Sequence, residues 1–384
     1  MARNSAQLGA GIVVGGLLAL GASVASREIM RRAGTRLIDW EAVRLIAHRR
    51  LGEAAAPIPA RQRAEAEAFY RATLLRIEPI VADEIGSQLP AALETPAVVD
   101  RLQWVDLNLS TFRSLFERIE KTLLTAQEGP DTAGRAISRW LNRTVGNQQL
   151  GFMLAFLGRK VLGQYDVSLL AAGPARGRLH FVEPNITATA AAMRIPRDEF
   201  RTFIALHEAT HAFEFEAHAW LRPYFADLVG RTMEQLASES GGLMERLREA
   251  LAGGEGHWLE RIMTPAQRAT FTRTQALMSL LEGYSNHVMN AAGARILPNF
   301  GEIHDRFERR GERRGTLERA IMRLTGLDLK MEQYAAGERF ADAVISERGR
   351  DFLNRVWTGP ELLPSLDEIR DPHSWIARVE GAAP

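Results

Sequence analysis

The 384-residue sequence contains no cysteine. Disulfide bonds and thiolate metal sites are therefore excluded, so any zinc must be held by histidine and carboxylate side chains. Histidine is itself scarce, with nine in the chain. A regular spacing between two of the nine is for that reason informative.

The sequence also lacks an excess of charge of either sign, because it contains 48 Lys and Arg and 47 Asp and Glu residues. Such a balance gives no general attraction to nucleic acid or acidic lipid. The most basic stretch, residues 306–314, interleaves glutamates with arginines, which is typical of a solvated helix face. We expect no nucleic-acid partner. With 46% hydrophobic residues, the chain can bury a large core.

Long hydrophobic runs are absent beyond Leu8 to Ala25, which holds no charged residue. Its length is marginal for a membrane span, and its glycines weaken an isolated helix. Three interpretations stay open: a membrane anchor, a secretory signal cleaved after Ala25, and a glycine-rich helix packed on the protein. Arginines follow the run directly, which favours a cytoplasmic location for the body of the protein. We expect a cytoplasmic protein, with possible membrane attachment through residues 8–25.

Helical spacing of apolar residues dominates the remainder of the chain. It predicts helices over residues 61–84, 96–125 and 134–162. A further helix is expected from Pro196 to about residue 217, and another over 275–292. Residues 178–183 alternate between polar and apolar side chains and are the best strand candidate. We therefore predict a mainly α fold with a small β element. The strand is either internal or an exposed edge to which an extended peptide could pair.

The chemistry is carried by an HExxH motif, HEATH at residues 207–211. On a helix, His207 and His211 share a face, so both imidazoles can reach one tetrahedral zinc at about 2.0–2.1 Å. Phe203 lies on the same face, which places the histidines on the buried side, where an imidazole without a partner is costly. Glu208 is displaced around the helix and could take a proton from a zinc-bound water as a general base.

A zinc site also needs a third protein ligand. His218 lies seven residues past His211, so the spacing of metzincins is absent. Glu282 and Asn286 are four residues apart on a predicted helix: Glu282 would ligate zinc and Asn286 would orient a ligand imidazole. Thermolysin-like gluzincins show this arrangement with an acidic residue in the outer position. His287 is the alternative third ligand.

Three further side chains could stabilise an oxyanion formed when water attacks a carbonyl. Tyr284 and His287 follow Glu282 closely, and Tyr165 is a more distant candidate. For each of them, a hydrogen-bonded structural role is the competing interpretation.

Seven segments, in this order, resemble the bacterial zincin-like metallopeptidases of type 2, a family of zinc-dependent hydrolases. They are IDW at 38–40, LGQYD at 162–166, VEPNI at 182–186, ALHEATH at 205–211, LMSLLEGY at 277–284, VWTGPE at 356–361 and IRDP at 369–372. The resemblance implies a mostly helical zincin-like fold, bound zinc and hydrolase activity, and it supports Glu282 as a ligand. It also implies a zincin-like hydrolase domain over residues 37–379, preceded by a hydrophobic segment at 1–36.

Two functions remain in competition. The first is a zinc metallopeptidase or amidase that cleaves a peptide or amide substrate with zinc-activated water. The second is a zinc-stabilised scaffold or binding protein without catalytic activity. An open coordination position beside a general base favours the enzyme, because structural zinc sites are normally closed by four protein ligands.

Overall fold

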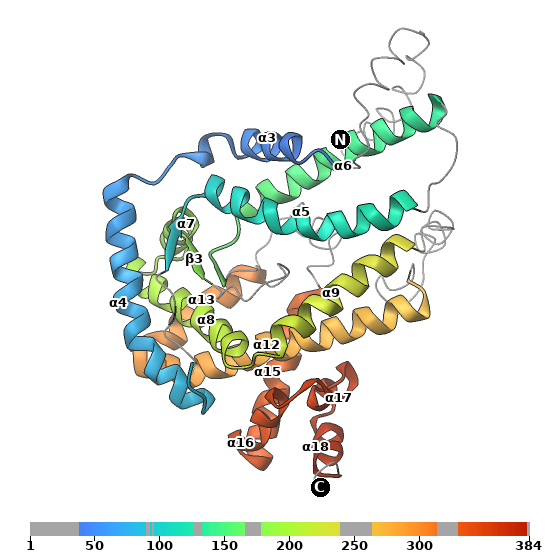
Figure 1. The fold of residues 1–384 in the computed structure, drawn as a ribbon. Helices are drawn as coiled ribbons and strands as arrows, with labels where there is room; N and C mark the ends of the chain where they lie inside the picture. Colours follow the sequence, from blue (N-terminus) through green and yellow to red (C-terminus); the bar gives the residue numbers. More distant parts are fainter. Residues whose placement is uncertain are drawn as a thin grey trace, which may run out of the picture.

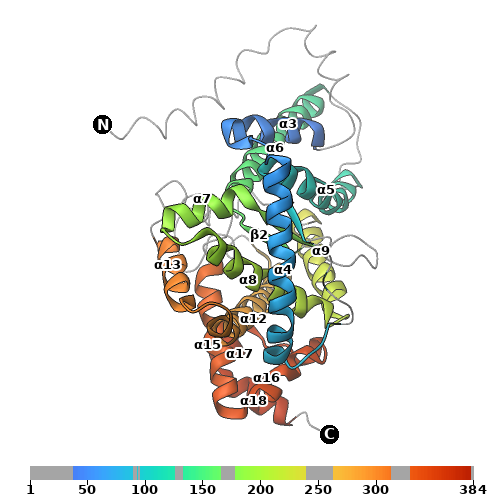
Figure 2. The same ribbon diagram turned by 90° about the vertical axis from the view of Figure 1, so that its left-hand side faces the viewer.

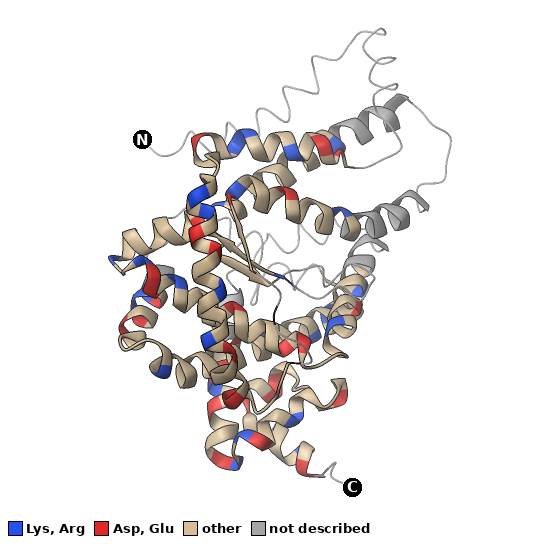
Figure 3. Cartoon of the chain, turned by 60° about the vertical axis from the view of Figure 1, so that its left-hand side comes forward, with Lys and Arg blue, Asp and Glu red and all other residues tan. Residues whose placement is uncertain are grey.

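The computed structural model describes residues 38–89, 93, 96–125, 133–165, 178–238, 263–312 and 329–381. The hydrophobic run at 8–25 lies outside these residues. Within them, no helix combines the length and the apolar character needed to cross a bilayer. Acidic and basic side chains are interspersed over the described chain (Figure 3), as the balanced composition predicts.

Four long helices form the first half of the fold: α3 (Trp40–Leu51), α4 (Ala60–Ile85), α5 (Arg101–Thr125) and α6 (Ala133–Gly158). The predicted helix at 61–84 matches α4, which ends where Gly86 adopts a left-handed conformation and its N–H bonds to the carbonyl of Ala82. In Figure 1, α3, α5 and α6 lie together at one end of the molecule. Figure 2 shows α4 running along the molecule in front of α8.

The second half is also helical. Its helices are α7 (Glu183–Met193), α8 (Arg197–Glu216), α9 (Leu221–Ser238), α12 (Pro265–Ile296), α13 (Phe300–Glu312), α15 (Leu329–Arg348), α16 (Arg350–Leu353), α17 (Leu366–Arg370) and α18 (Pro372–Gly381). Short 3-10 turns occupy Gly52–Ala55, Asn354–Trp357 and Pro360–Leu362. The helices expected after Pro196 and over 275–292 are confirmed as α8 and α12. Helix α12 begins earlier than expected, at Pro265, because Thr264 and Gln267 form a capping box.

The small β element is a three-stranded sheet with the order β1-β3-β2. Its strands are β1 (Ala97–Val99), β2 (Gly163–Tyr165) and β3 (Leu179–Val182); β1 is parallel to β3, and β2 is antiparallel to it. The predicted strand at 178–183 is confirmed as β3. It is the middle strand, so the interpretation of this segment as an exposed edge is wrong. The helix predicted over 96–125 is wrong at its start, where residues 97–99 form β1, and β2 was not predicted; three residues are too few to show an alternating pattern.

The sheet separates two hydrophobic clusters. Val98 and Phe181 point into the larger one, which contains the buried faces of α4, α8 and α12, and Phe181 stacks on Tyr70 of α4. Val99 and Val182 point to the opposite face, into a smaller cluster with α3, α5 and α6. This alternation is what a pleated strand requires. It packs the sheet on both faces and positions β2 beside α8.

Candidate metal centre

Helices α8 and α12 bring three side chains with metal-binding groups together. His207 and His211 lie one turn apart on α8, with their Nε2 atoms 3.2 Å from each other. Glu282 reaches them from α12, and its Oε2 lies 3.8 Å from Nε2 of His211. The potential ligand atoms of all three residues lie within 4.8 Å of one another. Glu282 thus occupies the place of the third ligand expected from the sequence.

This donor set fits zinc. Ligand atoms about 2.0–2.1 Å from a tetrahedral zinc lie about 3.3 Å apart, close to the 3.2 Å between the two Nε2 atoms. Two imidazoles and one glutamate form the three-ligand set of catalytic zinc sites. The charges around the site also favour a cation. In the described part of the chain, no Lys or Arg forms an ion pair with Glu208, Glu214 or Glu282. Glu214 and Glu282 each pair with His211. A divalent cation would compensate these buried carboxylates.

Glu208 lies beside the three-residue group and is held by the edge strand β2. Its Oε2 accepts a hydrogen bond from the backbone N–H of Tyr165 at 2.9 Å. Gly163 approaches it so closely that a Cβ at this position would lie 2.5 Å from Oε1 of Glu208. Burial raises the pKa of the Glu208 carboxyl to about 7. Burial thus makes this carboxyl hold its proton more readily than an exposed glutamate does.

Glu282 is positioned by a close crossing of α12 and α15. A Cβ on Gly283 would lie 2.0 Å from the backbone carbon of Gly337, and a Cβ on Gly337 would lie 1.8 Å from the carbonyl oxygen of Ser279. The two helices therefore touch backbone to backbone next to Glu282. This contact places the α12 axis, and with it the ligand side chain, at a defined distance from α8.

The expected role of Asn286 is wrong. Asn286 donates to Glu338 of α15 at 3.4 Å, and other groups bind the outward nitrogens of the imidazoles. Nδ1 of His211 lies 2.8 Å from Oε2 of Glu214, and Nδ1 of His207 lies 3.1 Å from the sulfur of Met289. Sequence reasoning missed Glu214, although its position three residues after His211 places it on the same side of α8.

Tyr284 and His287, the expected oxyanion residues, bond to other partners and are not members of the three-residue group. The Tyr284 hydroxyl donates to Oδ1 of Asn354 at 2.8 Å, and the buried ring packs edge-on against Trp357. His287 pairs with Asp342 of α15 through Nδ1 at 2.7 Å, which also removes it as the alternative third ligand.

Two residues near α8 have other partners. The Tyr165 hydroxyl donates to Glu216 and accepts from Arg222, so it is engaged, and only the backbone amide of Tyr165 reaches Glu208. His218 stacks on Trp357, with its Nδ1 2.7 Å from the carbonyl oxygen of Glu214. The exclusion of His218 as a ligand agrees with this position.

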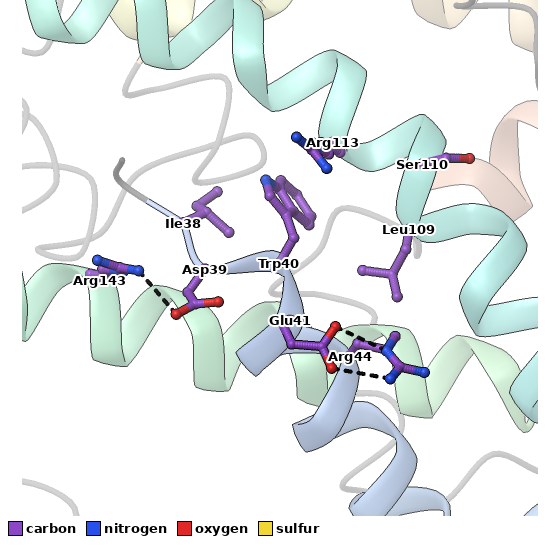
Figure 4. A pocket seen from close by; sticks show the side chains of 9 residues that line it. All are labelled: Ile38, Asp39, Trp40, Glu41, Arg44, Leu109, Ser110, Arg113 and Arg143. Carbon is purple, nitrogen blue, oxygen red and sulfur yellow. Dashed lines mark hydrogen bonds and ion pairs between the residues drawn. The ribbon is translucent and has the colours of Figure 1, made fainter. Parts of the chain in front are cut away.

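A surface pocket of the described chain lies elsewhere, between α3, α5 and α6 (Figure 4), and contains no residue of the metal centre. Two of its arginines have acidic partners in the same lining. Arg143 bonds to Asp39 at 3.0 Å, and Arg44 bonds to Glu41 at 3.1 Å. The pocket and the metal centre are separate features of the described chain.

Comparison with known proteins places these observations in a family. A family model described as zincin-like metallopeptidase matches residues 38–376. A solved structure from Chloroflexus aurantiacus, described as a "putative hydrolase with a novel fold", is 40% identical and superposes with a TM-score of 0.68. The match covers 90% of this chain and 100% of that one. No curated protein matches. The family implies a bound metal and hydrolase chemistry, and the chain belongs to the zincin-like metallopeptidases.

Proposed function

We propose that this protein is a zinc-dependent hydrolase that cleaves peptide or amide bonds. His207, His211 and Glu282 would hold the zinc, and Glu208 would act as the general base. The observation that carries the proposal is the convergence of three ligand groups within 4.8 Å, next to a buried carboxylate that is not part of the ligand set.

When bound, zinc supplies a Lewis acid that lowers the pKa of a coordinated water towards about 7. The protein's own contribution is proton transfer and orientation. Glu208 accepts the proton of the attacking water through one carboxylate oxygen and later delivers it to the leaving amine. The N–H of Tyr165 holds the other oxygen at 2.9 Å, so the carboxylate is oriented before the substrate arrives.

Strand β2 supports a peptide as the substrate. In an antiparallel pair, every second residue turns its N–H and C=O away from the partner strand. The carbonyl of Leu162 bonds to β3 through Val182, so Gly163 and Tyr165 direct these groups outward, as the bond from Tyr165 to Glu208 shows. Because Glu208 already takes the N–H of Tyr165, an extended peptide along this edge would pair with the outward groups of Gly163, beside Glu208. The peptide-binding edge proposed here is therefore β2 and not β3.

A non-catalytic zinc scaffold is the competing function. Structural zinc sites normally use four protein ligands, whereas the described residues form a group of three. Glu208 is buried, is held by its own hydrogen bond and lies outside that group. A structural zinc site does not require such a carboxylate. These two features favour the enzyme.

The test combines metal analysis with a peptide-library digest of the purified full chain. We expect one zinc per chain in the wild type and in Glu208→Gln, and a loss of cleavage by about 10²–10⁴-fold in the variant, the contribution of a general base. Glu302→Gln, an exposed glutamate on α13, is the matched control and should cleave like the wild type. If the wild type holds zinc but cleaves no faster than Glu208→Gln, the protein is a non-catalytic zinc scaffold.

A further inference from the structure

We propose that Glu214 is a positioning residue for the metal centre: its buried carboxylate accepts a hydrogen bond from Nδ1–H of His211 and thereby aims Nε2 at the metal. This inference rests on the proposed function, because it assumes that His211 is a zinc ligand. It assigns to Glu214 the orienting role that the sequence pattern gave to Asn286.

The geometry determines which tautomer His211 adopts. Oε2 of Glu214 lies 2.8 Å from Nδ1 of His211, and the two residues are three positions apart on α8. A carboxylate oxygen behind Nδ1 favours a proton on that nitrogen and turns Nε2 to the opposite side of the ring. Nε2 is the atom that faces His207 and Glu282. The tautomer selected by Glu214 is thus the one that can bind a metal from this side.

The burial of Glu214 supports a role beyond packing. Its side chain is 0% exposed, and its second oxygen, Oε1, has no hydrogen-bond partner. In the described part of the chain its ion pair is with His211 alone. A buried carboxylate with so little compensation costs stability. A divalent ion held by His211 would offset that cost, since the negative charge of Glu214 would help to balance the charge of the ion.

The two imidazoles are supported unequally. Nδ1 of His207 faces the thioether sulfur of Met289 at 3.1 Å, which is a weak acceptor, whereas His211 has a full carboxylate. A carboxylate behind a ligand histidine fixes its orientation and raises its basicity, and loss of such a partner typically lowers metal affinity by about 10–100-fold. The structure therefore assigns the stronger support to His211.

The decisive experiment measures zinc affinity and apo-protein stability on the same variants of the full chain, with a chromophoric chelator as competitor. Glu214→Gln keeps the size of the side chain and removes the charge. We expect its zinc dissociation constant to rise about 10–100-fold, while its apo-protein melts at or above the wild-type temperature because an uncompensated charge is gone. Glu214→Asp keeps the charge but moves it away from Nδ1 of His211, and its zinc dissociation constant should rise less. This variant replaces Glu214→Gln in the test if Glu214→Gln does not fold.

Tyr70→Phe is the matched control. It removes the buried hydrogen bond from Tyr70 to Glu183, which involves neither Glu214 nor the ligand histidines, so apo stability should fall while zinc affinity stays within twofold. A dissociation constant within twofold of wild type in both Glu214 variants, or a Glu214→Gln apo-protein that is destabilised without a change in affinity, would overturn the inference. Failure of the proposed function looks different, because the wild-type chain itself would then bind no zinc.

Discussion

Glycine 163 shows how a single residue can control the reacting group. Its missing side chain leaves room for the Glu208 carboxylate, and its neighbour Tyr165 orients that carboxylate from the same strand. Gln164, between them, points to the other face of β2 and bonds to Trp104 and Asn108 of α5. These contacts anchor β2 on one side so that its backbone can press against Glu208 on the other.

At this scale we predict that Gly163→Ala displaces the general base without removing the metal. The added Cβ would lie 2.5 Å from Oε1 of Glu208, and a displacement of about 1 Å can cost about 10²-fold in rate. Steady-state kinetics should show a kcat lowered by about 10- to 100-fold, with one zinc per chain retained. Gly301→Ala, whose Cβ meets nothing within 4 Å, should leave kcat unchanged. Loss of zinc together with activity would contradict the prediction.

Among the elements, the crossing of α12 with α15 determines where Glu282 lies. Long helices normally keep their axes 8–10 Å apart, at about the distance that intervening side chains require. Gly283 and Gly337 remove those side chains, so that backbone meets backbone at this point. On the other side, α8 is held by the buried pair of Arg201 with Glu183 at the start of α7. The site is thus built between two helices that are each packed on further elements.

We therefore predict that Gly283→Ala both destabilises the fold and weakens zinc binding. The new methyl group would lie 2.0 Å from the backbone of Gly337, so the helices must separate, at a cost of about 1–3 kcal/mol for overpacking. Urea unfolding should show a lower midpoint, and chelator competition should show weaker zinc binding because Glu282 moves with α12. Gly146→Ala on α6, which has free space around it, should be neutral or slightly stabilising. If Gly283→Ala is destabilised but binds zinc as tightly as the wild type, the crossing of α12 and α15 does not position Glu282.

For the whole molecule, the metal centre joins parts that are distant in the sequence. His207 and His211 come from α8, and Glu282 comes from α12, after the segment 239–262. Both helices line the larger hydrophobic cluster. A metal bound there would link two walls of that core, so its binding free energy would add to the stability of the folded chain.

The expected consequence is that removal of zinc lowers the melting temperature. Free zinc at 100 times its dissociation constant stabilises the native state by about 2.7 kcal/mol. Thermal unfolding of the chain with and without a chelator should show this loss, and added zinc should restore it. His207→Ala should melt at the same temperature in both conditions, whereas His218→Ala should still respond to zinc, since His218 stacks on Trp357 away from the ligand atoms. A wild-type melting temperature that does not change with the chelator would contradict a bound metal in this centre.

Patterns of local origin were predictable from the sequence alone. The spacing of His207 and His211, the helical periodicity around them and the absence of cysteine together determine a pair of ligands without thiolates. The resemblance of the segment containing Glu282 to a known family indicated Glu282 as the candidate third ligand, and the structure brings it next to the two histidines. These features lie within one or two helical turns, so a periodic pattern is sufficient to reveal them.

The partners of these residues depended on tertiary structure. Glu214 rather than Asn286 contacts the imidazole of His211, Tyr284 and His287 bond to Asn354 and Asp342, and the three-residue strand β2 holds Glu208. Each depends on how α8, α12, α15 and the sheet pack, and a change of helix rotation by one residue, about 100°, would exchange one set of partners for another. Sequence periodicity determined which helices carry the ligands; packing determined which side chains surround them.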